Sequence, residues 1–301
     1  METVQNELEQ ILNKEQILKN EPMDRHTTFR VGGPADYFLL PTVESLPDVL
    51  DILHRNQIPV TIIGNGSNLL ISDKGIRGAV IEVGKQMSDV FVQGECITAQ
   101  AGAILSKIAS AAYKNGLSGM EFAAGIPGSI GGAVVMNAGA YGGEMKDIVL
   151  SATVMKRDGT VQKLANEQLD FAYRHSCIVE QEYLVLDVKI RLHKAEPEQI
   201  FQKMEELKGQ RISKQPLEYP SAGSTFQRPK GNFAGKLIMD AGLSGFTIGG
   251  AQVSEKHCGF VINKGGATAA DIFALIQHIQ KTVKEQFGAE LKTEVKMLGE
   301  F

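Results

Sequence analysis

A long stretch of uncharged, glycine-rich backbone constrains the fold of this chain more than any other feature of its sequence. Residues 122–143 contain seven glycines and no Asp, Glu, Lys or Arg. The stretch is long enough to cross a bilayer, but a backbone interrupted by so many glycines and a proline would leave amides unpaired in lipid. We therefore expect it to be buried loop backbone that packs inside the protein.

The same region is the densest glycine cluster of the chain, because residues 116–143 hold nine of its 32 glycines. Glycine loses more backbone entropy on ordering than any other residue, so the cluster needs a local reason. Successive amides without side chains can approach an anion closely and donate N–H groups to it. Residues 125–132 (GIPGSIGG) predict such a cradle, and residues 137–142 are expected to wrap the same ligand. A glycine-rich packing motif in the core is the alternative.

A shorter glycine turn, residues 64–69 (GNGSNL), follows an apolar run at 60–63 that predicts a strand. Phosphate-binding turns also follow a strand. However, Leu69 stands where the dinucleotide fingerprint has Gly or Ala, and the GxxxxGK[ST] pattern is absent. By itself this turn predicts either a phosphate contact or an ordinary tight turn.

The rest of the composition excludes several classes of protein. The chain has 301 residues, which suits two domains, and its 43% hydrophobic and 22% charged residues are typical of a globular protein. A net charge of −4 gives no reason to expect a nucleic-acid partner. Cys96, Cys177 and Cys258 form no CxxC pair, so they predict neither a disulfide framework nor a zinc site. We expect no metal, no membrane segment and a cytoplasmic location.

The spacing of apolar residues predicts helices and strands that are mixed along the chain. Helices are expected over residues 4–20, 44–57, 103–115, 198–212 and 269–287. Strands are expected at 60–63, on both sides of the Asp158-Gly159 turn, at 183–192, where apolar residues alternate, and at 291–298. Because helices and strands do not alternate regularly, we predict the α+β class, with a domain boundary between residues 193 and 215.

Three polar positions are candidates for chemistry. Arg174 lies among apolar residues and could clamp an anion with two parallel hydrogen bonds, or form a surface salt bridge. His175 beside it is interpreted as a scaffold or surface histidine. Ser224 lies among small residues in PSAGSTFQRP, which suits close approach to a ligand, but no GxSxG elbow makes it a hydrolase nucleophile. Glu294, in a predicted strand, would by its local sequence be solvated.

Five separated segments, in order and spacing, resemble one family. They are GNGSNLL, GIPGSIGGAVVMNAGAYGGE, FAYRHS, SAGSTFQRP and LKTEV, and the resemblance extends from His26 to Glu294. The family is that of the UDP-N-acetylenolpyruvoylglucosamine reductases, flavoenzymes of bacterial cell-wall synthesis. The resemblance implies noncovalently bound FAD in a two-part domain of the vanillyl-alcohol-oxidase (PCMH) type, followed by an α+β substrate-binding domain.

The resemblance also implies how the chain is divided and what it binds. We expect an N-terminal helix in residues 1–24, an FAD-binding domain in 25–195 with two subdomains that separate near residue 85, and a substrate-binding domain in 196–301. NADPH is the implied co-substrate, and it would alternate with the sugar nucleotide in one pocket, which predicts ping-pong kinetics. A monomer is expected.

The family's catalytic positions fall on Arg174, Ser224 and Glu294. Arg174 would stabilise developing negative charge, Ser224 would deliver a proton, and Glu294 would act as a protonated donor or as an orienting group. The chain resembles a shorter subclass without an inserted tyrosine loop, so Arg228 is a candidate replacement ligand for the substrate, together with Arg174. The implied FAD contacts are Gly64, Asn65, Gly66, Ser67, Asn68, Leu69, Pro127, Gly128, Ser129, Gly131, Gly132, Asn137, Ala138 and Gly139.

Two other functions are compatible with these residues. One is a different FAD-dependent oxidoreductase on the same flavin domain. Many such enzymes tether FAD through His or Cys, and neither residue occurs inside the glycine segments. The other is a nucleotide-binding regulator without turnover, which would purify colourless or stay inert to NADPH.

Overall fold

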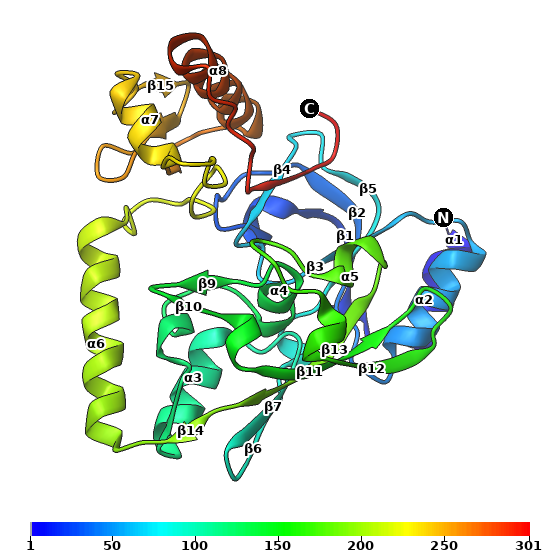
Figure 1. Ribbon diagram of the computed structural model, residues 1–301. Helices are drawn as coiled ribbons and strands as arrows, with labels where there is room; N and C mark the ends of the chain where they lie inside the picture. Colours follow the sequence, from blue (N-terminus) through cyan, green and yellow to red (C-terminus); the bar gives the residue numbers. More distant parts are fainter. Residues whose placement is uncertain (1) are drawn as a thin grey trace. The chain divides into compact units, whose positions relative to one another are not determined.

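The computed structural model describes residues 2–301, and their contacts divide the chain into two compact units (Figure 1). The first unit contains the residues up to 18, 38–65 and 80–211. The second unit contains residues 19–37, 66–79 and 212–301. Helices and antiparallel strands are mixed in both units, which confirms the α+β class.

The N-terminal part of the chain forms two short helices and a four-stranded sheet. The helices are α1 (Glu2–Leu8) and α2 (Leu46–Arg55), which pack against each other. The strand order is β1-β2-β5-β3, with bounds β1 Ile17–Pro22, β2 Pro34–Leu39, β3 Val60–Ile63 and β5 Ile76–Glu82. The helix predicted over residues 44–57 and the strand predicted at 60–63 are therefore confirmed.

The helix predicted over residues 4–20 is wrong beyond its first two turns. It ends at Leu8, and Ile17 and Leu18 begin strand β1 instead. Leu12 is buried, as a helical spacing would require, although it lies in a turn. Apolar periodicity alone cannot distinguish a short helix followed by a short strand from one longer helix.

A five-stranded antiparallel sheet forms the centre of the first unit. Its order is β12-β11-β13-β7-β6, with bounds β6 Val90–Gln93, β7 Cys96–Gln100, β11 Val149–Met155, β12 Val161–Ala165 and β13 Leu184–Arg191. The predicted hairpin is confirmed, because Gly159 turns the chain between β11 and β12 with a φ of 80°. The alternating apolar residues of β13 are buried, as expected for one face of a sheet against the core.

Short elements also belong to the first unit. They are β8 Leu117–Ser118, β9 Gly139–Ala140, β10 Gly143–Glu144, β14 His193–Lys194, α3 Leu105–Lys114, α4 Ile130–Val135 and α5 Cys177–Glu180. The longer helix α6 (Pro197–Lys214) begins in the first unit, and its residues from 212 on belong to the second. Gly116, with a φ of 62°, follows the end of α3 as predicted. The uncharged stretch is not all loop, because its centre forms helix α4. The Ser129 side chain accepts a hydrogen bond from the Gly132 amide there, which allows a helix to start among glycines.

The second unit is built around helix α8 (Ala269–Phe287) and a three-stranded sheet. That sheet has the order β15-β16-β17, with bounds β15 Thr247–Ile248, β16 Ala251–Val253 and β17 Val261–Asn263. Helix α7 (Ala234–Asp240) and the parallel pair β4 (Leu69–Ile71) and β18 (Lys296–Leu298) complete it. The Asp73 carboxylate accepts hydrogen bonds from the amides of Ala269 and Ala270, at 2.8 and 2.9 Å, and so caps α8.

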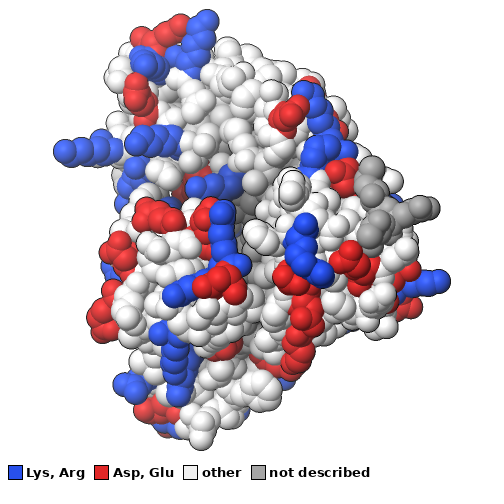
Figure 2. Space-filling model, turned by 90° about the vertical axis from the view of Figure 1, so that its right-hand side faces the viewer, with Lys and Arg blue, Asp and Glu red and all other residues white. Residues whose placement is uncertain are grey.

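Of the final strand predicted over residues 291–298, only 296–298 are strand. Among residues 2–301, every helix is too short or too polar to span a bilayer. On the face of the molecule drawn in Figure 2, basic and acidic side chains are interspersed.

Candidate functional site

The first two residues of the shorter glycine segment, Gly64 and Asn65, meet the longer segment within the first unit. The Asn65 side-chain amide donates to the Pro127 carbonyl oxygen at 2.8 Å, across 62 residues of sequence. A Cβ atom on Gly64 would lie 2.6 Å from the Ser129 Oγ, a distance that real Cβ atoms essentially never show. Glycine at position 64 is therefore required by the close approach of the two segments.

The backbone amides of these segments differ in how far they are already used. Within either unit, no described residue accepts a hydrogen bond from the amides of residues 64–68. In the longer segment the amides of Ile126, Gly128, Ile130 and Gly131 all donate to protein carbonyls. The expectation that the whole run 125–132 offers its amides to an anion is thus wrong for these four, because two of them bond within turns and the other two donate to the carbonyls of Ala103 and Ala101.

Packing explains one of the predicted cofactor glycines. A Cβ on Gly131 would lie 2.8 Å from the Ala101 Cβ, since α4 packs closely against the end of β7. A Cβ on Gly132 would meet only the Ser129 Oγ, at 3.5 Å. The first turn of α4 therefore has one face against the sheet and one bare face.

The segment that follows α4 contains two residues with a positive φ that are not glycine. Asn137 has a φ of 43° and is buried, and Tyr141 has a φ of 53° in the turn between β9 and β10. The Arg211 guanidinium lies 5.8 Å from the centre of the Tyr141 ring and packs against Gly125. Burial lowers the pKa of Arg211 from its ordinary value. No pattern in the sequence pointed to Arg211 at this position.

Arg174 lies at the tip of a tight turn. Ala172 and His175 exchange two backbone hydrogen bonds, each 3.2 Å long, so Tyr173 and Arg174 form a two-residue loop. Arg174 has a φ of 54° there, and its guanidinium lies 5.2 Å from the centre of the Tyr173 ring. The prediction for His175 is consistent with its place, since its ring lies 3.5 Å from the Asp170 carboxylate.

The Ser224 and Glu294 segments lie side by side in the second unit. The Glu294 amide donates to the Thr225 carbonyl at 2.8 Å, and Phe226 forms a β-bridge with Thr293. Glu294 is only 9% exposed, so the expectation of a solvated glutamate is wrong. This pairing joins segments about 70 residues apart in the sequence, and no local sequence pattern predicts it.

Buried contacts fix the position of Ser224. The neighbouring Thr225 is fully buried, its amide donates to the Gly259 carbonyl at 2.8 Å, and its Oγ1 accepts from the Val261 amide at 3.0 Å. On the other side, the Asn68 side chain donates to the Glu294 carbonyl at 3.1 Å. Part of the shorter glycine turn therefore contacts the backbone of the predicted acid.

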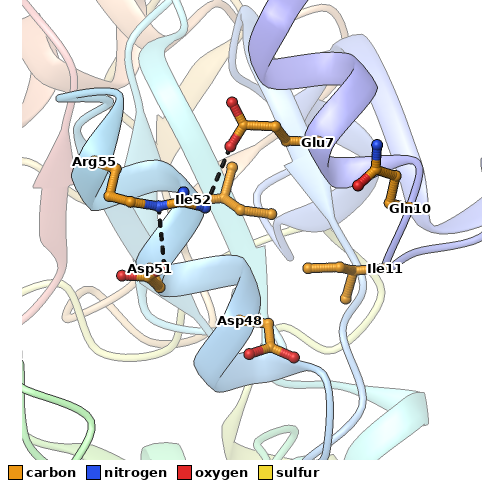
Figure 3. A pocket seen from close by; sticks show the side chains of 7 residues that line it. All are labelled: Glu7, Gln10, Ile11, Asp48, Asp51, Ile52 and Arg55. Carbon is orange, nitrogen blue, oxygen red and sulfur yellow. Dashed lines mark hydrogen bonds and ion pairs between the residues drawn. The ribbon is translucent and has the colours of Figure 1, made fainter.

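The last predicted substrate ligand, Arg228, is exposed, and its guanidinium lies 4.7 Å from the centre of the Phe233 ring. A surface pocket between α1 and α2 contains none of the predicted residues (Figure 3). In that pocket Arg55 forms ion pairs with Glu7, at 3.3 Å, and with Asp51, at 3.0 Å. The pocket therefore gives no support to the predicted chemistry.

Two family models each match one part of the chain. Residues 34–165 match the family model described as FAD binding domain. Residues 215–298 match the model described as UDP-N-acetylenolpyruvoylglucosamine reductase, C-terminal domain. The first model covers the two glycine segments, and the second covers Ser224, Arg228 and Glu294.

Relatives of known name cover nearly the whole chain. The UDP-N-acetylenolpyruvoylglucosamine reductase of Agathobacter rectalis is 55% identical over 95% of this chain and 95% of its own. That of Clostridium botulinum (strain Okra) is 53% identical over 98% of this chain and 96% of its own.

Solved structures give the same result. The crystal structure of the reductase from Thermus caldophilus has a TM-score of 0.82 at 33% identity, over 94% of this chain and 99% of its own. Alkyldihydroxyacetonephosphate synthase has a TM-score of 0.50 at 17% identity, over 64% of this chain and 41% of its own, which is a likeness of fold only.

Proposed function

Because the chain belongs to the UDP-N-acetylenolpyruvoylglucosamine reductase family, we propose that it reduces the enolpyruvyl ether of UDP-N-acetylglucosamine enolpyruvate to a lactyl ether. The product, UDP-N-acetylmuramate, is a precursor of peptidoglycan. NADPH and one proton supply the two hydrogens that are added to the double bond, and NADP⁺ leaves. The observation that carries this proposal is the 55% identity to a reductase over 95% of both chains.

The glycine segments fit noncovalent FAD. Amides of residues 64–68 without acceptors in their own unit, and a bare face on the first turn of α4, offer neutral donors to a pyrophosphate. We propose that residues 64–69, 127–132 and 137–139 line this site, with the Asn137 contact made by its backbone. Bound FAD supplies hydride transfer between NADPH and the substrate.

Arg174 is proposed to bind the substrate carboxylate. Addition of hydride to the terminal vinyl carbon leaves negative charge on the adjacent carbon and on the carboxylate attached to it. A guanidinium can donate two parallel hydrogen bonds to that carboxylate and stabilise the charge as it develops. The bonds between Ala172 and His175 hold the backbone of Arg174 in a tight turn. We propose that this turn orients the guanidinium before the substrate arrives, which is the condition for such stabilisation.

Ser224 is proposed to transfer the proton. Its Oγ–H would protonate the carbon next to the carboxylate, where the charge has accumulated. A hydroxyl is a weak acid, so the transfer depends on a strongly basic carbon and on a fixed geometry, which the buried Thr225 provides. Glu294, buried beside this segment, is proposed as a protonated donor or as the group that orients the proton donor.

The remaining expectations are part of the proposal. We propose that residues 1–24 are an N-terminal element, that 25–195 bind FAD and that 196–301 bind the sugar nucleotide, with Arg228 as a further substrate ligand. We also propose a cytoplasmic monomer. Light scattering of the purified protein tests the last point, because a monomer has a mass of 32.6 kDa.

Steady-state kinetics and product analysis test the activity. The protein should consume NADPH only when UDP-N-acetylglucosamine enolpyruvate is present. Mass spectrometry should show one product that has gained two hydrogens. Double-reciprocal plots at several NADPH concentrations should be parallel, as ping-pong turnover requires. Consumption of NADPH that does not depend on the sugar nucleotide would contradict the proposal.

A further inference from the structure

We propose that Asn137 is a positioning residue for Arg174: its side chain ties the turn that carries the arginine to the end of helix α4. The side-chain nitrogen of Asn137 donates to the Ala172 carbonyl at 3.1 Å, and Ala172 is one of the two residues that close the Arg174 turn. This inference rests on the proposed role of Arg174 in binding the substrate carboxylate.

The backbone of Asn137 completes the end of α4. The Ala138 amide donates to the Ala133 carbonyl at 2.8 Å, and the Asn137 amide donates to the Val134 carbonyl at 3.2 Å. These two bonds are a Schellman motif, in which the residue at the position of Asn137 adopts a left-handed conformation. Glycine is the usual residue there, because it has no Cβ to strain.

The side chain explains why asparagine stands at this glycine position. Its nitrogen donates to Glu144 Oε2 at 2.6 Å as well as to Ala172, and its oxygen accepts from the Lys146 amide at 2.9 Å. Asn137 is 1% exposed, so its own side-chain atoms in these three bonds are shielded from water. Glycine would keep the helix end but lose every one of them.

Like Asn137, Arg174 has a positive φ, a backbone conformation that favours glycine. In its two-residue loop only the second position has a positive φ, which is the pattern of a type II turn with glycine preferred at that position. Residues in such sparsely populated regions persist when their surroundings hold them there. The Asn137 bond to Ala172 and the Ser176 hydroxyl bond to the Val135 carbonyl, at 2.8 Å, hold the turn on both sides.

The variant Asn137→Gly tests the proposal, because glycine suits the left-handed backbone and removes the side chain together with its three hydrogen bonds. Asn56→Gly is the matched control. Asn56 follows α2 in the same unit, and its side chain donates to the Ile52 carbonyl at 2.9 Å. Asn137→Asp is a second variant, which keeps the oxygen acceptor but cannot donate to Ala172 and places a second carboxylate beside Glu144.

Hydrogen exchange measures the turn without turnover. In Asn137→Gly, the amides of Ala172 and His175 should exchange at least tenfold faster than in the unchanged protein. In Asn56→Gly they should exchange at the unchanged rate. Unchanged exchange of both amides in Asn137→Gly would overturn the proposal, because the side chain would then not hold the turn.

Anaerobic rapid mixing separates the two half-reactions of the loaded enzyme. Asn137→Gly and Asn137→Asp should lower the rate at which the enolpyruvyl substrate reoxidises the reduced protein by about tenfold or more. Both variants keep a backbone at residue 137, which is proposed to make the FAD contact, so the rate of reduction by NADPH should fall much less than the rate of reoxidation. Equal slowing of both half-reactions, or loss of FAD binding, would show that Asn137 supports the cofactor site in general, and would overturn the proposal.

A double-mutant cycle with Arg174→Ala separates this inference from the proposed function. If Asn137 acts through Arg174, Asn137→Gly should cause no further loss in the Arg174→Ala background. Effects that multiply would contradict a positioning role. If Arg174→Ala alone leaves reoxidation unchanged, it is the proposed role of Arg174 that fails. Faster exchange at Ala172 and His175 would in that case still show that Asn137 holds the turn.

Discussion

The glycine-rich region of the first unit and the Ser224–Glu294 region of the second are built in different ways. In the first, the reactive surface is backbone, and side chains such as that of Asn65 serve to bring two segments together. In the second, a hydroxyl and a carboxyl are placed by pairing two segments that are distant in sequence. Under the proposed function, the first region would hold the cofactor by its shape, and the second would transfer the proton.

The largest effect is expected from Ser224→Ala. If the second region supplies only the proton, the enolpyruvyl substrate should reoxidise the reduced protein about 10²–10⁴-fold more slowly, which is the usual contribution of a general acid. Reduction by NADPH should stay nearly unchanged. Rapid-mixing absorbance measurements on both half-reactions check this, and equal slowing of both would remove Ser224 from the proton transfer.

Arg174→Lys should have the next largest effect. Lysine keeps the positive charge but loses the two parallel donors, and losing one hydrogen bond to a charged group costs about 1.5–3 kcal/mol. The rate at which the substrate reoxidises the reduced protein should therefore fall by about 10–10²-fold. Near-normal turnover of this variant would show that Arg174 does not bind the carboxylate.

In the glycine-rich region, Gly64→Ala should weaken cofactor binding rather than proton transfer. Its new Cβ would lie 2.6 Å from the Ser129 Oγ, so that side chain must move from its preferred rotamer. We expect fluorescence titration to give about a tenfold higher Kd for FAD. Once FAD is saturating, the rate at which the substrate reoxidises the reduced protein should be unchanged.

Two further variants test the cause of that loss. Ser129→Ala removes the crowded oxygen but also the cap of α4. Gly64→Ala should therefore lower the FAD affinity less in the Ser129→Ala background than in the unchanged protein. Gly209→Ala, in helix α6 with open space around it, should leave FAD affinity unchanged and raise the stability by about 0.5–1 kcal/mol. If Gly209→Ala weakened FAD as much as Gly64→Ala, the close-approach explanation would be wrong.

The smallest effect concerns His257, next to the loop that supports Ser224. Burial lowers the pKa of this histidine, and its Nδ1 accepts a hydrogen bond from the Gly259 amide at 3.1 Å. The unfolded chain therefore binds a proton more readily than the folded one, and protonation favours unfolding. The free energy of unfolding should fall as the pH drops below about 6.5. Denaturant titrations at several pH values should show less of this fall in His257→Gln, and an equal fall in both proteins would exclude His257 as its cause.

Sequence features predicted the two regions to different extents. The glycine segments, the hairpin at Gly159 and the alternation in β13 depend on neighbours in the chain, and all were predicted. The burial of Glu294 and the position of Arg211 beside Gly125 depend on contacts between distant segments, which local patterns do not record. In residues 126–131, the glycines are visible in the sequence. The hydrogen bonds that already satisfy four of the amides depend on the folded backbone and could not be predicted from the sequence.

One anaerobic absorbance experiment tests most directly whether this chain passes hydrogen from NADPH to an enolpyruvyl sugar nucleotide. The purified protein should be yellow and should be bleached by one equivalent of NADPH. Adding UDP-N-acetylglucosamine enolpyruvate should then restore the colour and form one equivalent of UDP-N-acetylmuramate. A reduced protein that stays bleached in the presence of this substrate would contradict the account.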